Sequence, residues 1–283
     1  MELVCDNSEL IGIWGAEVPD IIVIGGYAIE RASIPTLLKR VQNVKVAHGL
    51  DRYCPIKWNL RDLDRALASH KLEGQQAILL AKSDPLRANL LSALTESGAT
   101  LFASAILAHS NNKQILGETR QDLVGYSFGN LLMRAGLYCQ EKAGGRRVDV
   151  LLDWPDRSDR TPFMDEYYAG WRHGHSAASE AVKYKCGTLA GLEFAPAPTF
   201  TGTEFEPRLQ IADLVVGVTR EFVNFALGKA PKASFGVQTF KTLIPNFYQD
   251  EGRVLGYGVT ASPTHSDFSG AILAGLKVLR GNG

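Results

Sequence analysis

The sequence predicts an α/β protein with a mixed central sheet flanked by helices. Short apolar runs rich in β-branched residues, such as residues 21–29 and 148–152, alternate with longer stretches whose apolar residues follow helical spacing, such as 121–142. This alternation continues through most of the 283 residues, without an internal repeat, a low-complexity segment or a convincing linker. We therefore expect one continuous α/β architecture.

Composition limits the classes of function. The 30 basic and 30 acidic residues give a formal net charge of zero, so no global field attracts nucleic acid or an anionic membrane, and polyanion binding needs a local basic patch. The N-terminal residues do not resemble a signal peptide, and no apolar run approaches membrane-spanning length. Four widely spaced cysteines indicate reduced thiols, so we expect a cytoplasmic protein: Cys5, Cys54, Cys139 and Cys186.

The first two strands carry the clearest signals in the N-terminal half. Residues 3–6 predict a strand that ends at Asp6, and residues 21–29 predict a buried strand that pairs with it, with a bulge or a close backbone contact at Gly25-Gly26. The other elements expected in this half are a helix capped by Ser33 and opened by Pro35 to about 44, an extended piece at 53–58, a helix from Asn59 to about 70, a short strand at 77–80, a helix at 83–98 and a buried strand at 99–108.

The C-terminal half continues the alternation. We expect a helix at 121–142, a strand at 148–152 followed by Asp153, a polar loop at 155–161, a helix at 162–179, a strand at 192–195, a helix at 206–227, a helix near 237–248, a strand at 254–259 and a helix at 266–279. Residues 1–228 are predicted to form the main domain, and residues 229–283 an α/β extension packed on it.

The helix predicted at 206–227 contains one aspartate, Asp213, among residues that are apolar on nearly every side. Such a helix is buried, and an isolated carboxylate inside it would cost several kcal/mol. Asp213 should therefore pair with a cation, bind a metal or be held protonated. Gln210 and Gly217 share its face, which indicates close approach of another segment.

Asp6 and Asp153 follow apolar strands, so they can join Asp213 at one site. Neighbouring strands can bring two carboxylates together and a helix packed across the sheet can supply a third, a donor set suited to Mg²⁺ or Mn²⁺. A metal site of this kind can hydrolyse phosphodiester bonds. The alternative is that the aspartates form structural ion pairs with arginines such as Arg208 or Arg220.

Several segments resemble the domain of unknown function 3800 family. They are the N-terminal run Cys5-Asp6-Asn7-Ser8, similar to the family's Asp-Glu-Ser-Gly, the run VLLDW at 150–154, the run LQIADLVVG at 209–217 and, more weakly, Ile56-Lys57-Trp58, which is similar to the family's Glu-x-Lys. The resemblance covers most of the chain up to about residue 228. It implies a ribonuclease-H-like fold.

By position, the resemblance also implies a nuclease site. Asp6, Asp153 and Asp213 would bind Mg²⁺ or Mn²⁺, Lys57 would contact phosphate, and DNA or RNA would be the partner. The chain departs from the family at Asn7 and Pro55, where acids are expected, and at Glu9, where glycine is expected. These departures favour the alternative function, a catalytically degenerate module that binds nucleic acid or a protein partner. The sequence leaves open a homo-oligomer.

Other polar residues give weaker signals. His173 and His175 point in different directions on a helix, so a metal site is the minor interpretation. His109 is more readily a satisfied core histidine than a site residue. Five arginines near Asp153 predict either a basic patch for phosphates or a solvated loop: Arg146, Arg147, Arg157, Arg160 and Arg172.

Overall fold

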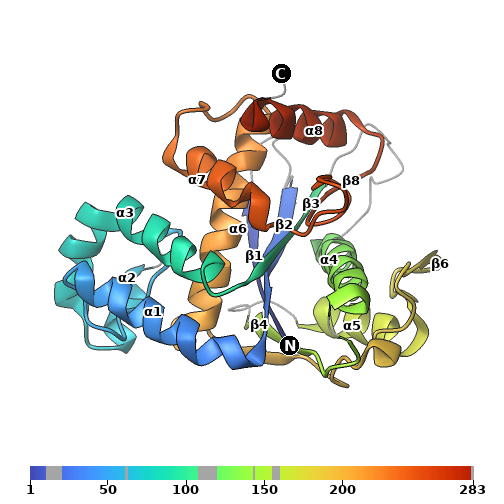
Figure 1. Ribbon diagram of the computed structural model, residues 1–283, viewed down its shortest axis with the longest axis horizontal. Helices are drawn as coiled ribbons and strands as arrows, with labels where there is room; N and C mark the ends of the chain where they lie inside the picture. The colour runs from blue at the N-terminus through green and yellow to red at the C-terminus, as the bar shows by residue number, and fades with distance from the viewer. Residues whose placement is uncertain (11–20, 61–62, 108–119, 143, 155–159, 282–283) are drawn as a thin grey trace.

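The computed structural model describes residues 1–10, 21–60, 63–107, 120–142, 144–154 and 160–281. Among these residues, six strands form a mixed central sheet with helices on both faces, which confirms the predicted α/β architecture (Figure 1). The strand order is β7-β4-β1-β2-β3-β8. The strands are β1 (Glu2–Leu10), β2 (Ile21–Ile29), β3 (Thr100–Leu107), β4 (Asp149–Asp153), β7 (Thr199–Thr201) and β8 (Val259–Ser262).

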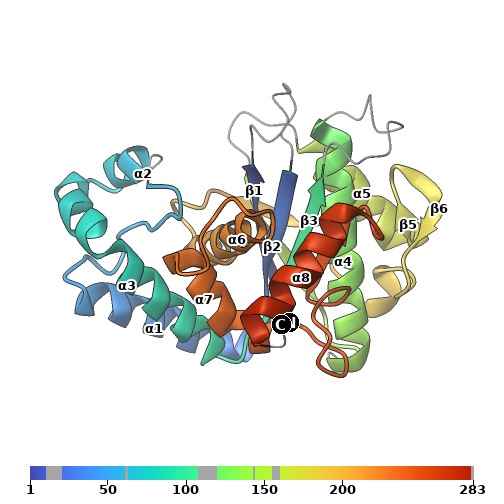
Figure 2. The ribbon, with the colours of Figure 1, turned by 90° about the horizontal axis from the view of Figure 1, so that it is seen from above.

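The helices lie in two layers on either side of this sheet. One layer holds α6 against the sheet, with α1, α2, α3, α7 and α8 around it, and the other holds α4 and α5 (Figures 1 and 2). The helices are α1 (Ile34–Ala47), α2 (Leu63–Ser69), α3 (Gln76–Thr95), α4 (Arg120–Lys142), α5 (Thr161–His173), α6 (Pro207–Ala226), α7 (Phe235–Leu243) and α8 (Asp267–Arg280). A separate hairpin pairs β5 (His175–Ser176) with β6 (Ser179–Lys183).

The pairing of β1 with β2 is antiparallel and regular, with Cys5 opposite Gly26 and Asp6 opposite Gly25. The bulge predicted at these glycines is therefore wrong, and the alternative, a close backbone contact, is confirmed. A Cβ added to Gly25 would lie 2.9 Å from the carbonyl oxygen of Phe102 in β3 and 3.3 Å from Cγ2 of Val216 in α6. The small residue lets α6 pack directly on the sheet.

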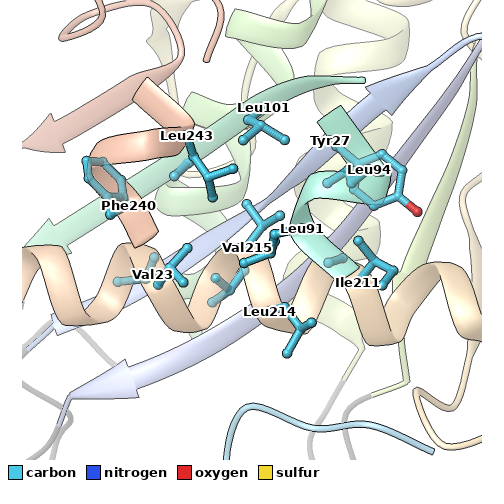
Figure 3. Close-up of a cluster of buried hydrophobic side chains, with 14 of the residues drawn as sticks. Val23, Tyr27, Leu91, Leu94, Leu101, Ile211, Leu214, Val215, Phe240 and Leu243 are labelled. Atoms are coloured by element: carbon cyan, nitrogen blue, oxygen red, sulfur yellow. The ribbon is translucent and has the colours of Figure 1, made fainter. Parts of the chain in front are cut away.

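Strand side chains alternate between two hydrophobic cores. Val23 and Tyr27 of β2 point to the α6 face, where they pack with Leu214, Val215 and Phe240 (Figure 3). Ile22 and Ile24 of the same strand belong to the core on the α4 face, together with Phe128 and Leu132. Because both faces are covered, the central strands read as continuous apolar runs in the sequence.

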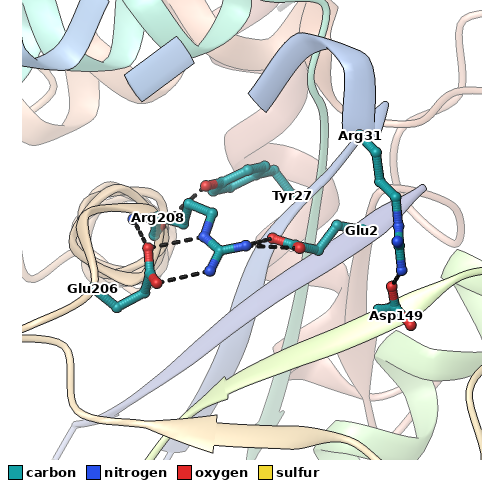
Figure 4. A network of polar contacts seen from close by, with 6 residues as sticks. All are labelled: Glu2, Tyr27, Arg31, Asp149, Glu206 and Arg208. Carbon is teal, nitrogen blue, oxygen red and sulfur yellow. Dashed lines mark hydrogen bonds and ion pairs between the residues drawn. The ribbon is translucent and has the colours of Figure 1, made fainter. Parts of the chain in front are cut away.

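Polar contacts fasten α6 to the first strand at its N-terminal end. Arg208 donates to both carboxylate oxygens of Glu2 at 2.7 Å and pairs with Glu206 at 2.7 Å, and Tyr27 donates its hydroxyl to the Arg208 carbonyl at 3.1 Å (Figure 4). Nearby, Arg31 pairs with Asp149. Arg208 therefore bridges the strand that carries Asp6 and the helix that carries Asp213.

Several expected elements differ from the structure. Residues 77–80 are helical, because they form the first turns of α3, which is kinked at Lys82 just before the predicted start at 83. Ser33 is the last residue of a 3-10 turn (Arg31–Ser33) and makes no side-chain cap bond, so the predicted cap is wrong. The helix predicted at 162–179 ends at His173, since Gly174 adopts a left-handed conformation and starts the β5–β6 hairpin.

The short strands also differ from their predicted positions. Residues 190–192 form a 3-10 turn, and Phe194 makes only an isolated bridge to Val148, so the strand that pairs with β4 is β7 rather than 192–195. The strand predicted at 254–259 starts where that range ends, at Val259. Segments of three or four residues are too short to show a periodic pattern, so the position of such a strand depends on which neighbouring strand it pairs with.

The C-terminal residues continue the same sheet. β8 pairs in parallel with β3, and α7 and α8 pack on α6. The helix predicted at 266–279 is α8, which Ser266 caps through a reciprocal capping box with Ser269. The four cysteines are free and buried. None of the described helices is both long and apolar enough to span a membrane.

Candidate active site

All four predicted site residues line one cavity of about 360 Å³. Asp6 lies in the middle of β1, which continues to Leu10, so the prediction that this strand ends at Asp6 is wrong; Asp153 ends β4 as predicted. These strands are parallel neighbours with Cys5 opposite Leu152, so the residues that follow, Asp6 and Asp153, lie side by side where β4 ends. Asp213 comes from α6, which crosses β1 and β2. Lys57 comes from the segment between α1 and α2, which has no regular secondary structure at 53–57.

Asp6 is the most buried of the three aspartates, with 6% of its surface exposed. Its Oδ1 accepts a hydrogen bond from the backbone N–H of Asn7 at 2.7 Å. Burial raises the pKa of Asp6 well above its ordinary value, and the charges of Asp153 and Asp213 raise it further. The three carboxylates are therefore close enough to repel one another.

Asp153 is held by a residue that the sequence did not single out. Its Oδ1 accepts from the backbone N–H of Thr203 at 2.8 Å and from the Thr203 hydroxyl. Burial raises the pKa of Asp153, while the bonds from Thr203 and the charge of Lys57 oppose that shift. Thr203 thus fixes the rotamer of Asp153 at the end of β4.

Asp213 accepts a hydrogen bond from the backbone N–H of Trp58. Burial raises its pKa to about 6, against the lowering effects of that bond and of Lys57. The Asp213 carboxyl, in the middle of α6, therefore titrates close to neutral pH. Strongly shifted pKa values of this kind are common at active sites, so Asp213 is a candidate functional residue.

Lys57 supplies positive charge to the three carboxylates. Burial lowers its pKa, but Asp213, Asp153 and Asp6, in that order, raise it more, so the pKa of Lys57 stays above its ordinary value. The side chain therefore carries a charge in the cavity at neutral pH.

Trp58 is the residue for which Gly217 makes room. A Cβ on Gly217 would lie 2.1 Å from Cγ of Trp58, so only glycine permits this packing. The guanidinium of Arg87 lies 4.6 Å from the centroid of the Trp58 ring, and it also donates to the Trp58 carbonyl. The close approach predicted on this face of α6 is thereby confirmed, and it places the Trp58 N–H at Asp213.

The predicted arginine partners do not neutralise the aspartates. Arg208 pairs with Glu2 and Glu206 at the N-terminal end of α6, outside the cavity. Arg220 lines the cavity but donates to the Ser8 hydroxyl at 3.2 Å, and it pairs with Glu221 at 4.0 Å. The structural ion pairs considered from the sequence are therefore not the role of these two arginines.

The geometry of the cavity only partly agrees with the predicted metal site. In the described ranges, no group of three or more His, Cys, Asp or Glu side chains is arranged to hold a metal ion as it stands. The donor chemistry nevertheless suits a hard cation: three carboxylates line one cavity, and burial and repulsion raise the pKa of each. Mg²⁺ often uses one or two carboxylates and keeps several waters.

The arginines predicted near Asp153 do not form one patch at the cavity. Arg146 pairs with Glu30 and Arg147 with Asp149, both near the start of β4. Arg172 contacts Tyr168 on α5. Arg160 stacks 4.1 Å from the centroid of the exposed Trp154, just beyond Asp153. Arg157 lies outside the described residues, as do His109 and the polar loop at 155–159.

The two histidines considered as ligands lie away from this cavity. The rings of His173 and His175 stack at 5.4 Å, and His175 lies in the hairpin beside Glu166. Neither residue lines the carboxylate cavity.

Three contributors were not predicted as site residues. Arg220 lies seven residues after Asp213 and three after Gly217, so the helical repeat could have placed it on the same face. Thr203 and Glu204 had no such signal. Glu204 adds a fourth carboxylate whose charge raises the pKa of both Asp153 and Lys57.

Comparison of the chain with protein-family models, with curated proteins and with solved structures gave no match.

Proposed function

We propose that this protein is a divalent-metal-dependent nuclease that hydrolyses phosphodiester bonds in nucleic acid. The observation that supports the proposal is the convergence of Asp6, Asp153, Asp213 and Lys57, far apart in the sequence, on one polar cavity. Three carboxylates from two neighbouring strands and α6, opposed by a lysine and without an arginine ion pair among the described residues, form a donor set for Mg²⁺ or Mn²⁺.

The strand order also supports the ribonuclease-H-like fold that the sequence resemblance implies. In the described residues, β1, β2 and β3 form an antiparallel meander, and β4 and β7 continue the sheet in parallel on the side of β1. An antiparallel meander extended by parallel strands next to its first strand is the arrangement expected for that fold. β8 is an addition at the opposite edge.

Two of the three aspartates, completed by water and substrate oxygens, are enough ligands for a Mg²⁺ or Mn²⁺ ion. When bound, the cation would polarise the phosphodiester and lower the pKa of the attacking water. Asp6 and Asp153 would hold it from the sheet, with Thr203 fixing Asp153. Asp213, whose pKa lies at about 6, would bind the ion or accept a proton from the water.

Lys57 and Arg220 would bind the substrate backbone. Both line the cavity with the aspartates, and the Lys57 ammonium is held charged by them. Two cations beside a carboxylate set can receive the phosphate oxygens and stabilise the charge that develops on them. These two side chains supply, in a globally neutral chain, local cations that can contact a phosphate backbone.

A Mn²⁺ soak of crystals tests the site without a guess about the substrate. We expect anomalous density between Asp6, Asp153 and Asp213. Carboxylates that converge without density would favour the second candidate, a degenerate module that binds nucleic acid or protein without metal, for which Asn7 and Pro55 in place of acids are the supporting observation.

Activity is tested on single-stranded and duplex oligonucleotides of DNA and RNA with Mn²⁺. Asp213→Asn should reduce cleavage by more than about 100-fold, since even groups that only support a metal ligand contribute about 10- to 100-fold. Asp165→Asn is the matched control, because Asp165 is exposed on α5 and lies outside the cavity. Wild-type cleavage by the Asp213 variant would remove that residue from the proposed mechanism.

A further inference from the structure

A second cavity, of about 630 Å³, lies between α4, β8 and the start of α8. It shares no lining residue with the carboxylate cavity in the described part of the chain. Its size falls within the range of about 300–1,000 Å³ that small-molecule sites usually have. The lining combines apolar side chains, such as Leu255 and Leu273, with several hydroxyl groups and one guanidinium, that of Arg134.

Arg134 is a cation without a counter-ion among the described residues. Its Nε is buried and has no hydrogen-bond partner there, and it forms no ion pair with another described residue. Burial lowers the pKa of Arg134, and the groups that oppose this shift are Tyr257, Tyr248 and Cys186 rather than a carboxylate. A partly buried guanidinium without an acidic partner destabilises the folded protein. A bound anion would remove this unfavourable free energy.

Thr260 provides the independent second observation. It is 7% exposed, it lines the same cavity from β8, and its hydroxyl has no hydrogen-bond partner within the described ranges. Buried hydroxyls are normally satisfied, so an unsatisfied one at a cavity wall indicates a missing partner. Arg134 and Thr260 thus line the same cavity, and each has a buried polar atom without a hydrogen-bond partner among the described residues.

None of the described acidic side chains lines this cavity. The other ionisable side chain in its described lining is His265, and an imidazole can only add positive charge. The first turn of α8 also borders the cavity, but its capping box and its own acidic residue, Asp267, already occupy that terminus. Affinity for an anion therefore rests on Arg134 and Thr260, and the helix dipole adds little.

From this lining we infer that the cavity binds a small organic anion, with its phosphate or carboxylate group at Arg134 and Thr260 and its apolar body against Leu255 and Leu273. Arginine suits both anions, because its planar guanidinium can donate two parallel hydrogen bonds to either. This site stands apart from the proposed nuclease chemistry and does not depend on it.

Calorimetric titration of the full chain, stripped of metal with EDTA and then exchanged into chelator-free buffer, tests the inference, since removal of metal excludes metal-dependent binding at the carboxylate cavity. Phenyl phosphate, benzoate and benzyl alcohol serve as probes, because they share a ring and differ in charge. We expect phenyl phosphate or benzoate to bind at least tenfold more tightly than benzyl alcohol. The tighter of the two identifies the anion as phosphate or carboxylate.

Two variants assign the site. Arg134→Met keeps the length of the side chain and should weaken the bound anion at least tenfold, and Thr260→Val keeps the shape and should weaken it severalfold. Arg52→Met, at an exposed arginine outside the cavity, should leave binding unchanged. Because Arg134 lacks a described partner, its replacement should also raise the melting temperature of the unliganded protein.

Three results would overturn the inference. They are equal affinity for benzyl alcohol and the two anions, anion binding that survives both Arg134→Met and Thr260→Val, and no binding of any probe at millimolar concentration. Loss of the fold in Arg134→Met would likewise contradict it, because that result would make the guanidinium a structural group.

Discussion

In the absence of a bound metal ion, the carboxylates of the candidate active site destabilise the folded protein. Burial, and to a smaller degree repulsion from neighbouring carboxylates, raises the pKa of Asp6, Asp153 and Asp213, so each of them resists ionisation in the native state. For Asp213 the ordinary value of 3.8 rises to about 6. Between these values the native state holds more protons than the unfolded state, so stability falls as pH rises through this window.

Replacement of Asp213 by asparagine should therefore stabilise the metal-free protein. A pKa shift from 3.8 to about 6 corresponds to on the order of 2–3 kcal/mol at pH 7, and the amide oxygen can still accept from the Trp58 N–H. The difference should shrink toward zero below about pH 4, where the wild-type carboxyl is protonated. Urea unfolding in EDTA at both pH values measures it.

Addition of Mn²⁺ provides the control for this prediction. The ion should raise the unfolding midpoint of the wild type more than that of Asp213→Asn, because ligand binding stabilises only the state that holds the ligand. A variant less stable than the wild type at pH 7 without metal would mean that a structural partner holds Asp213 ionised.

At the scale of elements, two turns of α6 arrange the cavity. Asp213, Gly217 and Arg220 lie on the same face, where Asp213 contributes a carboxylate, Gly217 makes room for Trp58 and Arg220 contributes a cation. The segment with Lys57 and Trp58 has no secondary structure of its own, and it is held in place by contacts with α6 and with Arg87 of α3.

Gly217→Ala should displace Trp58 and disturb the site. The added methyl would lie 2.1 Å from the ring, so the indole must move and the N–H bond to Asp213 must lengthen. We expect a loss of about 1–3 kcal/mol of stability from overpacking and a lower cleavage rate. Tryptophan fluorescence and thermal unfolding measure the displacement.

The matched control is Gly125→Ala in α4. Its new methyl would meet only the Pro162 carbonyl oxygen at 3.8 Å, an ordinary contact, among the described residues. The higher helix propensity of alanine should make this variant neutral or more stable by up to about 1 kcal/mol. Equal behaviour of the two variants would show that Trp58 does not depend on Gly217.

Arg208 fastens α6 to β1, so Arg208→Met should loosen the two elements that carry Asp213 and Asp6. Glu2 and Glu206 would lose their partner, with only 11% and 19% of their side chains exposed. We expect a loss of about 2–4 kcal/mol in urea unfolding. Addition of Glu2→Gln should recover part of it, because one unpaired charge is removed.

Arg40→Met is the control for the Arg208 prediction. Arg40 pairs with Glu96 at 2.6 Å, but both side chains are well exposed, at 38% and 61%. Its loss should change stability by less than about 1 kcal/mol. A similarly small effect at Arg208 would mean that the network with Glu2 and Glu206 contributes no more than a surface pair.

At the scale of the whole molecule, the C-terminal residues complete the fold that holds the site. Phe222 of α6 stacks on Phe240 of α7 with ring centroids 4.1 Å apart, and Ile272 of α8 belongs to the same core. β8 covers the edge of β3. The sheet and α6 therefore depend on residues beyond 228 for burial.

A chain that ends at residue 228 should fail to fold cooperatively. It would expose Phe222 and its neighbours on α6 and leave β3 as an uncovered edge, which invites aggregation. Size-exclusion chromatography, dye binding to exposed apolar surface and thermal unfolding measure this. A monomeric fragment with a sharp transition like that of the full chain would show that residues 229–283 are dispensable.

Much of the local structure of this protein could be predicted from its sequence. Apolar runs located β2, β3 and β4, helical spacing located α4, and a long run that is apolar on nearly every side located α6. The aspartates in or after these apolar segments identified three of the residues that converge, while Lys57 came from the family resemblance. These features are readable because periodicity and the cost of a buried charge are properties of a short segment.

Tertiary structure decided which segments meet. It placed Thr203 on Asp153 and Trp58 on Gly217, and it brought Arg134 and Thr260 to one cavity. It also defined β7 and β8, which are too short to carry a pattern and become strands only by pairing with β4 and β3. Such contacts join residues far apart in the chain, and their energy depends on packing and desolvation that no local pattern records.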